Sequence, residues 1–142
     1  MPVLLQILLG SVLLLACSAI HIRLITALIA RLKSESGKQY RKPERQEFYR
    51  TSFVFVALLA SHTVQIYLWA VAFWLFNALK GYEEPIYFSL VTYTTLGYGD
   101  VTLSDGWRIF GAMASANGIL AFGLSTAVLV GYFAHIWGEK RE

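Results

Sequence analysis

The sequence predicts an all-α membrane protein that has three transmembrane helices and one short helix that enters the membrane without crossing it. Of its 142 residues, 56% are hydrophobic and only 15% are charged, against about 25% charged in a soluble domain. The apolar residues gather in three long stretches, Val3 to Leu32, Phe53 to Leu79 and Trp107 to Trp137. Each exceeds the roughly 20 residues that cross a hydrocarbon core about 30 Å thick. Membrane lipids are therefore the expected surroundings of the chain.

Composition also excludes several classes of protein. Cys17 is the only cysteine, so the chain is not a disulfide scaffold and has too few ligands for a structural zinc site. The sequence is too apolar for a disordered chain, and it has no internal repeat of the kind that forms a solenoid. The formal net charge of +3 is compatible with nucleic-acid binding. However, nine of the 12 Lys and Arg residues lie in two places, seven of them in residues 31–50 and two at Lys140 and Arg141. The topology of the chain in the membrane, described next, explains this excess of basic residues. We therefore expect no nucleic-acid partner.

Three crossings place the basic segment 33–50 and the C-terminal tail on the same side of the membrane. The positive-inside rule makes that side the cytoplasm, so the N-terminus lies outside. The segment from Lys80 to Arg108 is then also outside, where its four acidic residues outnumber its two basic ones.

The first apolar stretch is predicted to be a retained helix rather than a cleaved signal peptide. No Lys or Arg precedes it, and cleavage before Cys17 would leave about 15 residues before Arg31, too few for a span. His21 and Arg23 interrupt its inner part, and charges in such positions often mark function. The alternative is that Arg23 extends its guanidinium to the lipid headgroups. A voltage sensor needs several regularly spaced arginines, and this helix has one.

The segment between the second and third spans carries the chemistry. It reads EEPIYFSLVTYTTLGYGD over residues 83–100. Pro85 suits the first turn of a helix and the two preceding glutamates suit its N-terminal dipole, so we expect a helix over 85–94. Ten residues span about 15 Å, half a membrane, so this helix must turn back to the side it entered from. Non-helical backbone at that depth is tolerated where it lines a hydrated cavity, which indicates a pore.

Residues 94–100, Thr-Thr-Leu-Gly-Tyr-Gly-Asp, resemble the selectivity filter of the potassium channel family. Alternating glycines allow φ values barred to other residues, so that successive carbonyl groups can point at one axis. A lone Gly-Tyr-Gly would indicate only a turn, but here a half-membrane helix precedes it and apolar spans flank it. The filter implied by the resemblance consists of Thr95, Leu96, Gly97, Tyr98 and Gly99.

The resemblance also implies how the ion is bound. The carbonyl oxygens of Thr95, Leu96, Gly97 and Tyr98, with the Thr95 hydroxyl, would replace the hydration shell of a potassium ion. The side chains of Leu96 and Tyr98 would point away and pack against the short helix. Leu96 stands where the family more often has Val or Ile, which leaves the carbonyls in place. The residues that would support the filter are Thr94, Asp100 and Tyr87.

We expect a hydrogen bond from the Tyr87 hydroxyl to Asp100, which directly follows the filter. The alternative is that Tyr87 and Tyr93 are aromatic residues of the membrane interface. On the second span, His62 and Gln65 are most simply interpreted as interhelical hydrogen-bonding residues.

The third span resembles the pore-lining inner helix of the family. Gly118 stands where family members carry a hinge glycine, although this glycine, like Gly111, Gly123 and Gly131, could instead allow close helix packing. Near the end of the span, His135 is a candidate pH sensor or simply a residue at the headgroups. The side chains expected to line the cavity, with the gate at 130–134, are Ile119, Phe122, Thr126, Val130 and Ala134.

The predicted domain organisation has four parts. A pore unit of this kind needs two full spans, so the additional first helix is expected at its periphery. The parts are the N-terminal transmembrane helix 1–32, the basic cytoplasmic loop 33–50, the pore domain 51–138 and the cytoplasmic tail 139–142. The pore domain divides into the outer helix 51–79, the pore helix 85–94, the filter 95–100 and the inner helix 107–137.

One chain supplies one filter strand, whereas a cage of oxygens needs four, so we expect a homotetramer with closed cyclic symmetry. The predicted function is a potassium-selective channel that conducts passively, with no catalysis and no cofactor besides permeant potassium ions. The alternatives are a less selective cation channel and a non-conducting accessory subunit of a larger potassium channel. The small size suits a bacterial inner membrane.

Overall fold

The computed structural model describes residues 1–36 and 44–139 and contains four helices in that part of the chain, with no strand. They are α1 (Val3–Ser36), α2 (Glu44–Leu75), α3 (Glu83–Tyr93) and α4 (Arg108–Glu139). Three of them are long and apolar enough to cross a membrane, over Val3–Leu32, Arg45–Leu75 and Arg108–Ala134. The all-α membrane fold predicted from the sequence is therefore confirmed.

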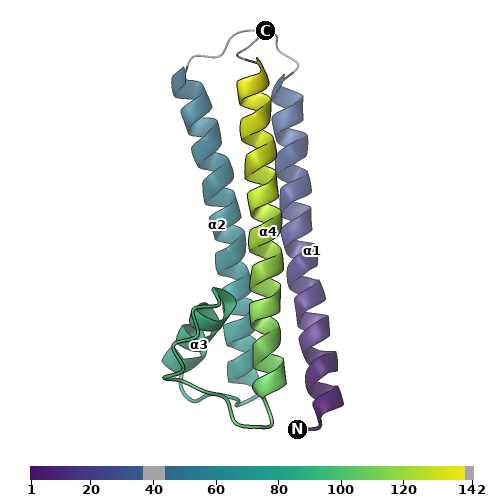
Figure 1. Cartoon of the computed structure of the whole chain (residues 1–142), viewed down its shortest axis with the longest axis vertical. Coiled ribbons are helices and arrows are strands. Elements are labelled where there is room, and N and C mark those ends of the chain that lie inside the picture. Colours follow the sequence, from purple (N-terminus) through teal and green to yellow (C-terminus); the bar gives the residue numbers. More distant parts are fainter. Residues whose placement is uncertain (37–43, 140–142) are drawn as a thin grey trace.

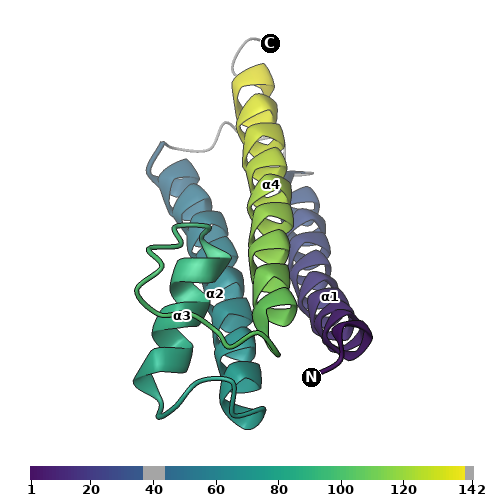
Figure 2. The ribbon, with the colours of Figure 1, turned by 60° about the horizontal axis from the view of Figure 1, so that its bottom comes forward.

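The three long helices run side by side (Figure 1), and α1 packs against both α4 and α2. The short helix α3 lies beside α2 at the end of the bundle that holds the N-terminus, and the C-terminus lies at the opposite end. Seen from below, α3 and the loops on either side of it stay at this end of the bundle (Figure 2). The segment between α2 and α4 therefore enters and leaves on one side, which is the arrangement expected of a re-entrant segment.

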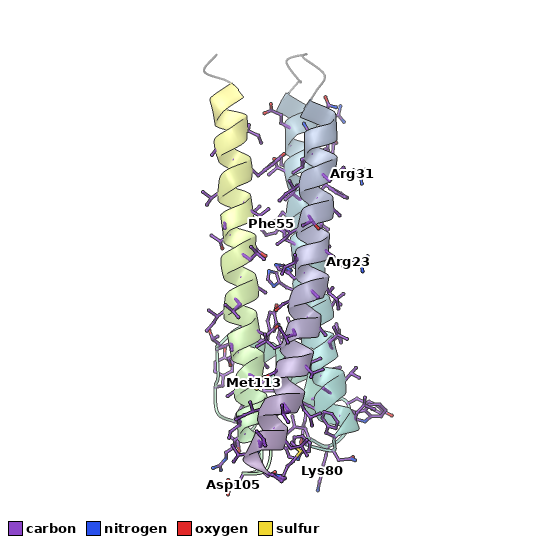
Figure 3. The ribbon with its side chains drawn as sticks, turned by 90° about the vertical axis from the view of Figure 1, so that its right-hand side faces the viewer. Arg23, Arg31, Phe55, Lys80, Asp105 and Met113 are labelled. Carbon is purple, nitrogen blue, oxygen red and sulfur yellow. The ribbon has the colours of Figure 1, made fainter. Side chains whose placement is uncertain are left out.

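Charged side chains mark the two ends of the bundle. Lys80 and Asp105 lie at the end where α3 is found, and Arg31 lies toward the other end (Figure 3). The Arg31 guanidinium lies 4.9 Å from the ring centre of Phe53 on α2. Arg23 is exposed and lies on α1 about 12 Å from Arg31, nearer the middle of the bundle (Figure 3).

Two helix boundaries differ from the apolar stretches. α1 continues to Ser36 and α2 already begins at Glu44, so that helix occupies much of the segment 33–50 expected as a loop. The first residues of α2, which include Arg45 and Glu47, are good helix formers, and an apolar stretch marks the span rather than the end of the helix. Residues 37–43 and 140–142, which the predicted loop and tail include, lie outside the described residues.

α2 ends at Leu75, four residues before the predicted end of the outer helix. Asn77 adopts a left-handed φ of 51°. The N–H of Asn77 donates to the carbonyl of Trp74 (3.0 Å), and the N–H of Ala78 donates to the carbonyl of Phe73 (2.9 Å). This pair of bonds is a Schellman motif, and asparagine is one of the residues that tolerate its left-handed position.

Aromatic side chains pack the bundle together around α3. Trp69 and Phe73 on α2, and Phe110 on α4, are fully buried. The ring centres of Trp69 and Phe110 are 5.2 Å apart, and Phe73 lies edge-on to Phe88 of α3 at 5.1 Å. Such edge-to-face and tilted pairs contribute about 0.5–1.5 kcal/mol each beyond their buried area. The aromatic cluster therefore fixes α3 against α2 and α4.

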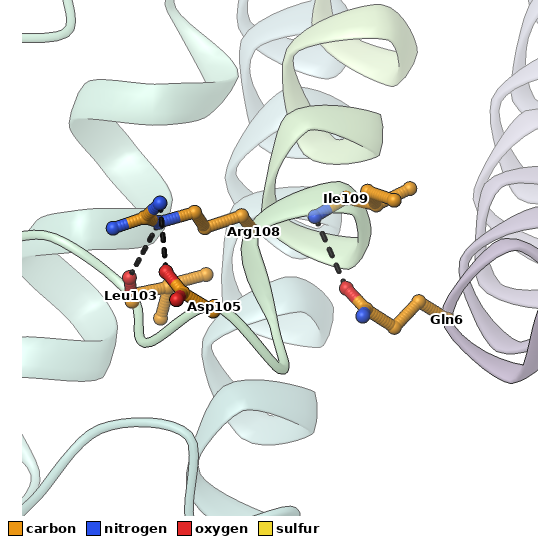
Figure 4. A network of polar contacts seen from close by, with 5 residues as sticks. All are labelled: Gln6, Leu103, Asp105, Arg108 and Ile109. Atoms are coloured by element: carbon orange, nitrogen blue, oxygen red, sulfur yellow. Dashed lines mark hydrogen bonds and ion pairs between the residues drawn. The ribbon is translucent and has the colours of Figure 1, made fainter. Parts of the chain in front are cut away.

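α1 is fixed to α4 by a buried polar contact at the same end. The side-chain oxygen of Gln6 accepts hydrogen bonds from the backbone N–H groups of Ile109 (3.1 Å) and Phe110 (3.4 Å), as Figure 4 shows for Ile109. These are two of the N–H groups that the first turn of any helix leaves without an internal partner. Beside them, Arg108 pairs with Asp105 at 2.7 Å (Figure 4). Gln6 thus caps α4 from another helix.

Candidate functional site: the filter segment and its supports

The helix α3 positions the segment 94–100 and is held on both sides. Its 11 residues make it about 16 Å long. The Ser89 hydroxyl donates to the carbonyl of Ile66 on α2 (2.6 Å), and the Ser115 hydroxyl of α4 donates to the carbonyl of Thr92 (2.9 Å). α3 therefore presents its last turn to the filter segment from a fixed position.

The filter segment begins with a second Schellman motif. The N–H of Thr95 donates to the carbonyl of Thr92 (3.0 Å), and the N–H of Leu96 donates to the carbonyl of Val91 (2.9 Å). The left-handed position is occupied by Thr95, whose φ is 63°. A β-branched residue in this conformation is strained by about 1–3 kcal/mol, unlike Asn77 at the end of α2. The sequence predicted left-handed backbone only at the glycines.

Left-handed and ordinary φ values alternate along the filter segment. Thr95, Gly97 and Gly99 have φ values of 63°, 52° and 76°, whereas Leu96 and Tyr98 between them do not have positive φ. This alternation turns successive peptide carbonyl groups toward one side of the strand, which a regular strand or helix does not do. The predicted use of the two glycines agrees with this geometry.

The first backbone donors of the filter segment bond within the chain, whereas its carbonyl oxygens accept no bond from the described residues. The N–H groups of Thr95, Leu96 and Gly97 all donate to the last turn of α3, Gly97 to the carbonyl of Val91 at 3.2 Å. Among the described residues, no backbone or side-chain donor bonds to the carbonyl oxygens of residues 95–98. A row of four oxygens is therefore available to a ligand that accepts electron pairs, such as a cation.

The side chains of Leu96 and Tyr98 are exposed, at 56% and 68% of their surface. The expectation that they pack against the short helix concerns the assembled filter of four strands and stays a prediction. The buried residues of α3, among them Ser89 and Tyr93, face α2 and α4.

The Tyr87 hydroxyl donates to the Asp100 carboxylate at 2.6 Å, so the hydrogen bond expected between them is present. The other carboxylate oxygen accepts the N–H of Val101 (3.0 Å). The bond from Tyr87 lowers the pKa of Asp100 below its ordinary value of 3.8 and raises the pKa of Tyr87 above its ordinary value of 10.0. A cavity of about 350 Å³ lies between the filter segment, α3 and the start of α4, lined in part by Tyr87, Asp100 and Arg108.

The five side chains expected to line a cavity all lie exposed on α4. They are Ile119, Phe122, Thr126, Val130 and Ala134. Among Ile119, Phe122 and Val130, the side chain of Phe122 is the least exposed, at 41%. Its ring stacks on the ring of His62, with the ring centres 4.3 Å apart. The side chain of His135, the candidate pH sensor, lies outside the described residues.

Gly118 is in close contact with the end of α3. A β-carbon added to it would overlap the carbonyl oxygen of Tyr93, whereas a β-carbon at Gly123 or Gly131 would meet nothing within 4 Å. α4 runs as one helix through Gly118. Of the two interpretations left open by the sequence, close packing explains Gly118 in this structure.

Sequence reasoning missed most of a buried polar network in the middle of the bundle. His62 and Gln65 do form hydrogen bonds between helices, as expected. His21 was singled out in the first span, but no partner was predicted for it. The other members were not identified as functional candidates, because single serines, tyrosines and asparagines in apolar stretches carry little signal. They are Ser61, Tyr93, Asn117 and Ser125.

Residues 53–135, more than half of the chain, match the family model described as an ion channel. The chain belongs to this ion channel family. The matched region contains most of α2, all of α3, the filter segment and most of α4, whereas α1 lies outside it. A transmembrane ion channel is thus an integral membrane protein, in agreement with the three apolar helices.

The matching curated relatives include much longer proteins. The A-type voltage-gated potassium channel KCND3 of Rattus norvegicus and that of Homo sapiens are each 33% identical to this ion channel over 94 residues. The alignment covers 60% of this chain and 14% of each relative. No solved structure matches the chain.

The contact at Gly118 predicts that Gly118→Ala lowers the free energy of unfolding of this ion channel by about 1–3 kcal/mol, because the new methyl group displaces α3 from α4. Gly123→Ala is the matched control on the same helix and should leave stability unchanged or raise it, since alanine favours helix. The measurement is denaturant unfolding in detergent. Equal stability of the two variants would contradict the close packing.

The Tyr87–Asp100 bond predicts a stability contribution that is constant from about pH 5 to about pH 9. The lowered pKa of Asp100 means that the contribution is present above 3.8 and is lost as the pH falls through the lowered value. The raised pKa of Tyr87 means that it persists up to pH 10.0 and is lost only above this. The measurement compares wild type with Tyr87→Phe across this range. A stability difference that already disappears at pH 6 would rule the bond out as its source.

Proposed function

We propose that the protein is a potassium-selective channel that conducts potassium passively. The observation that carries this proposal is the alternation of φ along Thr95, Gly97 and Gly99, with four carbonyl oxygens that no described protein donor uses. Potassium ions are bound in their filter by rings of such backbone carbonyls. The named relatives are potassium channels, and their 33% identity adds support.

In this proposal the carbonyl oxygens of residues 95–98 bind the permeant ion and the Thr95 hydroxyl adds a further ligand. Thr94, Asp100 and Tyr87 support the strand, the last two through their 2.6 Å hydrogen bond. Among the described residues no group of three or more His, Cys, Asp or Glu side chains is placed to hold a metal ion. The proposal includes no ion besides permeant potassium.

The functional unit in this proposal is a homotetramer. One strand offers oxygens on one side of the ion only, so a closed ring of four copies is needed to surround it. In this tetramer the side chains of Leu96 and Tyr98, which are exposed in one chain, pack against a neighbouring copy. The exposed face of α4, from Ile119 to Ala134, then lines the cavity below the filter.

The proposed orientation places the N-terminus and α3 outside and the C-terminus in the cytoplasm, because seven of the 12 basic residues lie in residues 31–50. A cysteine introduced as Ser36→Cys in a Cys17→Ala background should therefore not react with an impermeant maleimide added to intact cells. Reaction after permeabilisation is the control. Labelling in intact cells would reverse the orientation.

Reconstitution in liposomes tests the function directly. The wild-type protein should carry potassium flux that is much larger than sodium flux, because the filter carbonyls replace the hydration shell of potassium. Gly99→Ala should abolish the selectivity or the flux while the protein still inserts, since Gly99 has a φ of 76° that alanine adopts only with strain.

Three outcomes separate the candidate functions. Equal potassium and sodium flux through the wild type would indicate the less selective cation channel. Absence of flux from the purified tetramer would indicate an accessory subunit. Wild-type selectivity in Gly99→Ala would refute the filter assignment.

A further inference from the structure

A series of hydrogen-bonded, buried polar side chains crosses the bundle from α1 to α3. His21 of α1 lies 2.8 Å from the hydroxyl of Ser61 on α2 through Nδ1, and 3.0 Å from the hydroxyl of Ser125 on α4 through Nε2. The same Ser125 hydroxyl lies 3.0 Å from Nε2 of His62, whose Nδ1 lies 3.0 Å from the hydroxyl of Tyr93. All of these residues are at most 6% exposed. Four helices therefore meet in one hydrogen-bonded network.

Such a network is costly to place among apolar helices unless every member has a partner. Polar side chains at membrane depth that are retained in this way often have a role in function. The filter support already described, Tyr87 with Asp100, shares no residue with this network. The network is thus a second, separate set of contacts with the helix that carries the filter.

The amides of Gln65 and Asn117 extend this network. The side-chain N–H of Asn117 donates to the Gln65 oxygen (2.9 Å), and the Gln65 amide nitrogen donates to the carbonyl of Ser61 (3.4 Å). The same nitrogen lies 3.4 Å from Nδ1 of His21. Both ring nitrogens of His21 and both of His62 therefore have a hydrogen-bonding partner.

Tyr93 connects this hydrogen-bonded network to the filter segment. It is the last residue of α3 and is fully buried, with its ring edge-on to Phe122 and its carbonyl group against Gly118. The turn that it completes supplies the carbonyl groups of Val91 and Thr92, to which the filter N–H groups bond. A shift of Tyr93 therefore moves the acceptors that hold the filter strand.

We propose that His62 is a positioning residue for the selectivity filter, and that α1 contributes to filter geometry through His21. The bond from His62 to the Tyr93 hydroxyl holds the last turn of α3 in the position that keeps Thr95 left-handed. Ser125 and His21 hold the imidazole of His62 in turn. This inference rests on the proposed potassium-channel function.

The test uses the full chain in liposomes and measures the ratio of potassium to sodium permeability. Tyr93→Phe removes only the hydroxyl that His62 reaches, so the tetramer and the potassium flux should be retained. The permeability ratio should fall about threefold to tenfold, the effect of one lost buried hydrogen bond. Tyr67→Phe is the matched control, since Tyr67 lies on α2 and is 51% exposed, and should leave the ratio unchanged.

Two further variants separate positioning from a general loss of stability. His62→Phe keeps a ring to stack on Phe122 and should lower the ratio as Tyr93→Phe does, and the double variant should be no worse than either single one, because both remove the same bond. His21→Phe on α1 should lower the ratio in the same direction by a smaller factor.

The outcomes distinguish this inference from the proposed function. A selective wild type with an unchanged ratio in Tyr93→Phe would overturn the inference alone. Effects of His62→Phe and Tyr93→Phe that multiply in the double variant would also overturn it, because they would be independent. An unselective wild type would refute the proposed function, and the inference with it.

Discussion

The last turn of α3 is the structural element on which the filter segment depends. Within a membrane every backbone N–H needs a partner, and a strand that offers its carbonyl oxygens to an ion cannot use these oxygens to pair with another strand. The N–H groups of Thr95, Leu96 and Gly97 are instead taken up by Val91 and Thr92. One helix end thus satisfies the first three donors of the strand and leaves its carbonyl oxygens for the ion.

This solution places strain at one residue. Thr95 adopts a left-handed φ although it is β-branched, and glycine at that position would remove the strain together with the hydroxyl group. A strain of about 1–3 kcal/mol persists only where surrounding contacts determine the conformation. Contacts with the neighbouring helices hold α3 in place. Ser89 of α3 bonds to α2, and Ser115 and Gly118 of α4 contact the last turn of α3.

The features that were predictable from the sequence have strong local signals. Apolar length predicted the three spans, Pro85 and the glutamates before it predicted α3, and the alternating glycines predicted the left-handed positions in the filter. The Tyr87–Asp100 bond followed from a resemblance and is present. Each of these depends on a few neighbouring residues or on a motif of fixed spacing.

The features that were missed depend on which residues meet in space. Ser61 and Ser125 are 64 positions apart and look like ordinary small residues of transmembrane helices, yet both bond to His21. Gly118 could be a hinge or a packing contact until the carbonyl group of Tyr93 is placed beside it. Thr95 has no sequence signal for a left-handed conformation, because its φ is imposed by the helix end before it.

The same reasoning explains why α1 docks where it does, although the family match begins only at residue 53. In lipid, apolar side chains gain little by exchanging one apolar neighbour for another, so an apolar face alone does not select one docking position for an additional helix. α1 has two buried polar anchors, Gln6 at the start of α4 and His21 in the middle of the bundle. They lie 15 residues apart, about 22 Å along the helix, and they fix both its position along α4 and its rotation. Polar groups that are costly to bury therefore specify the contact that apolar packing leaves undetermined.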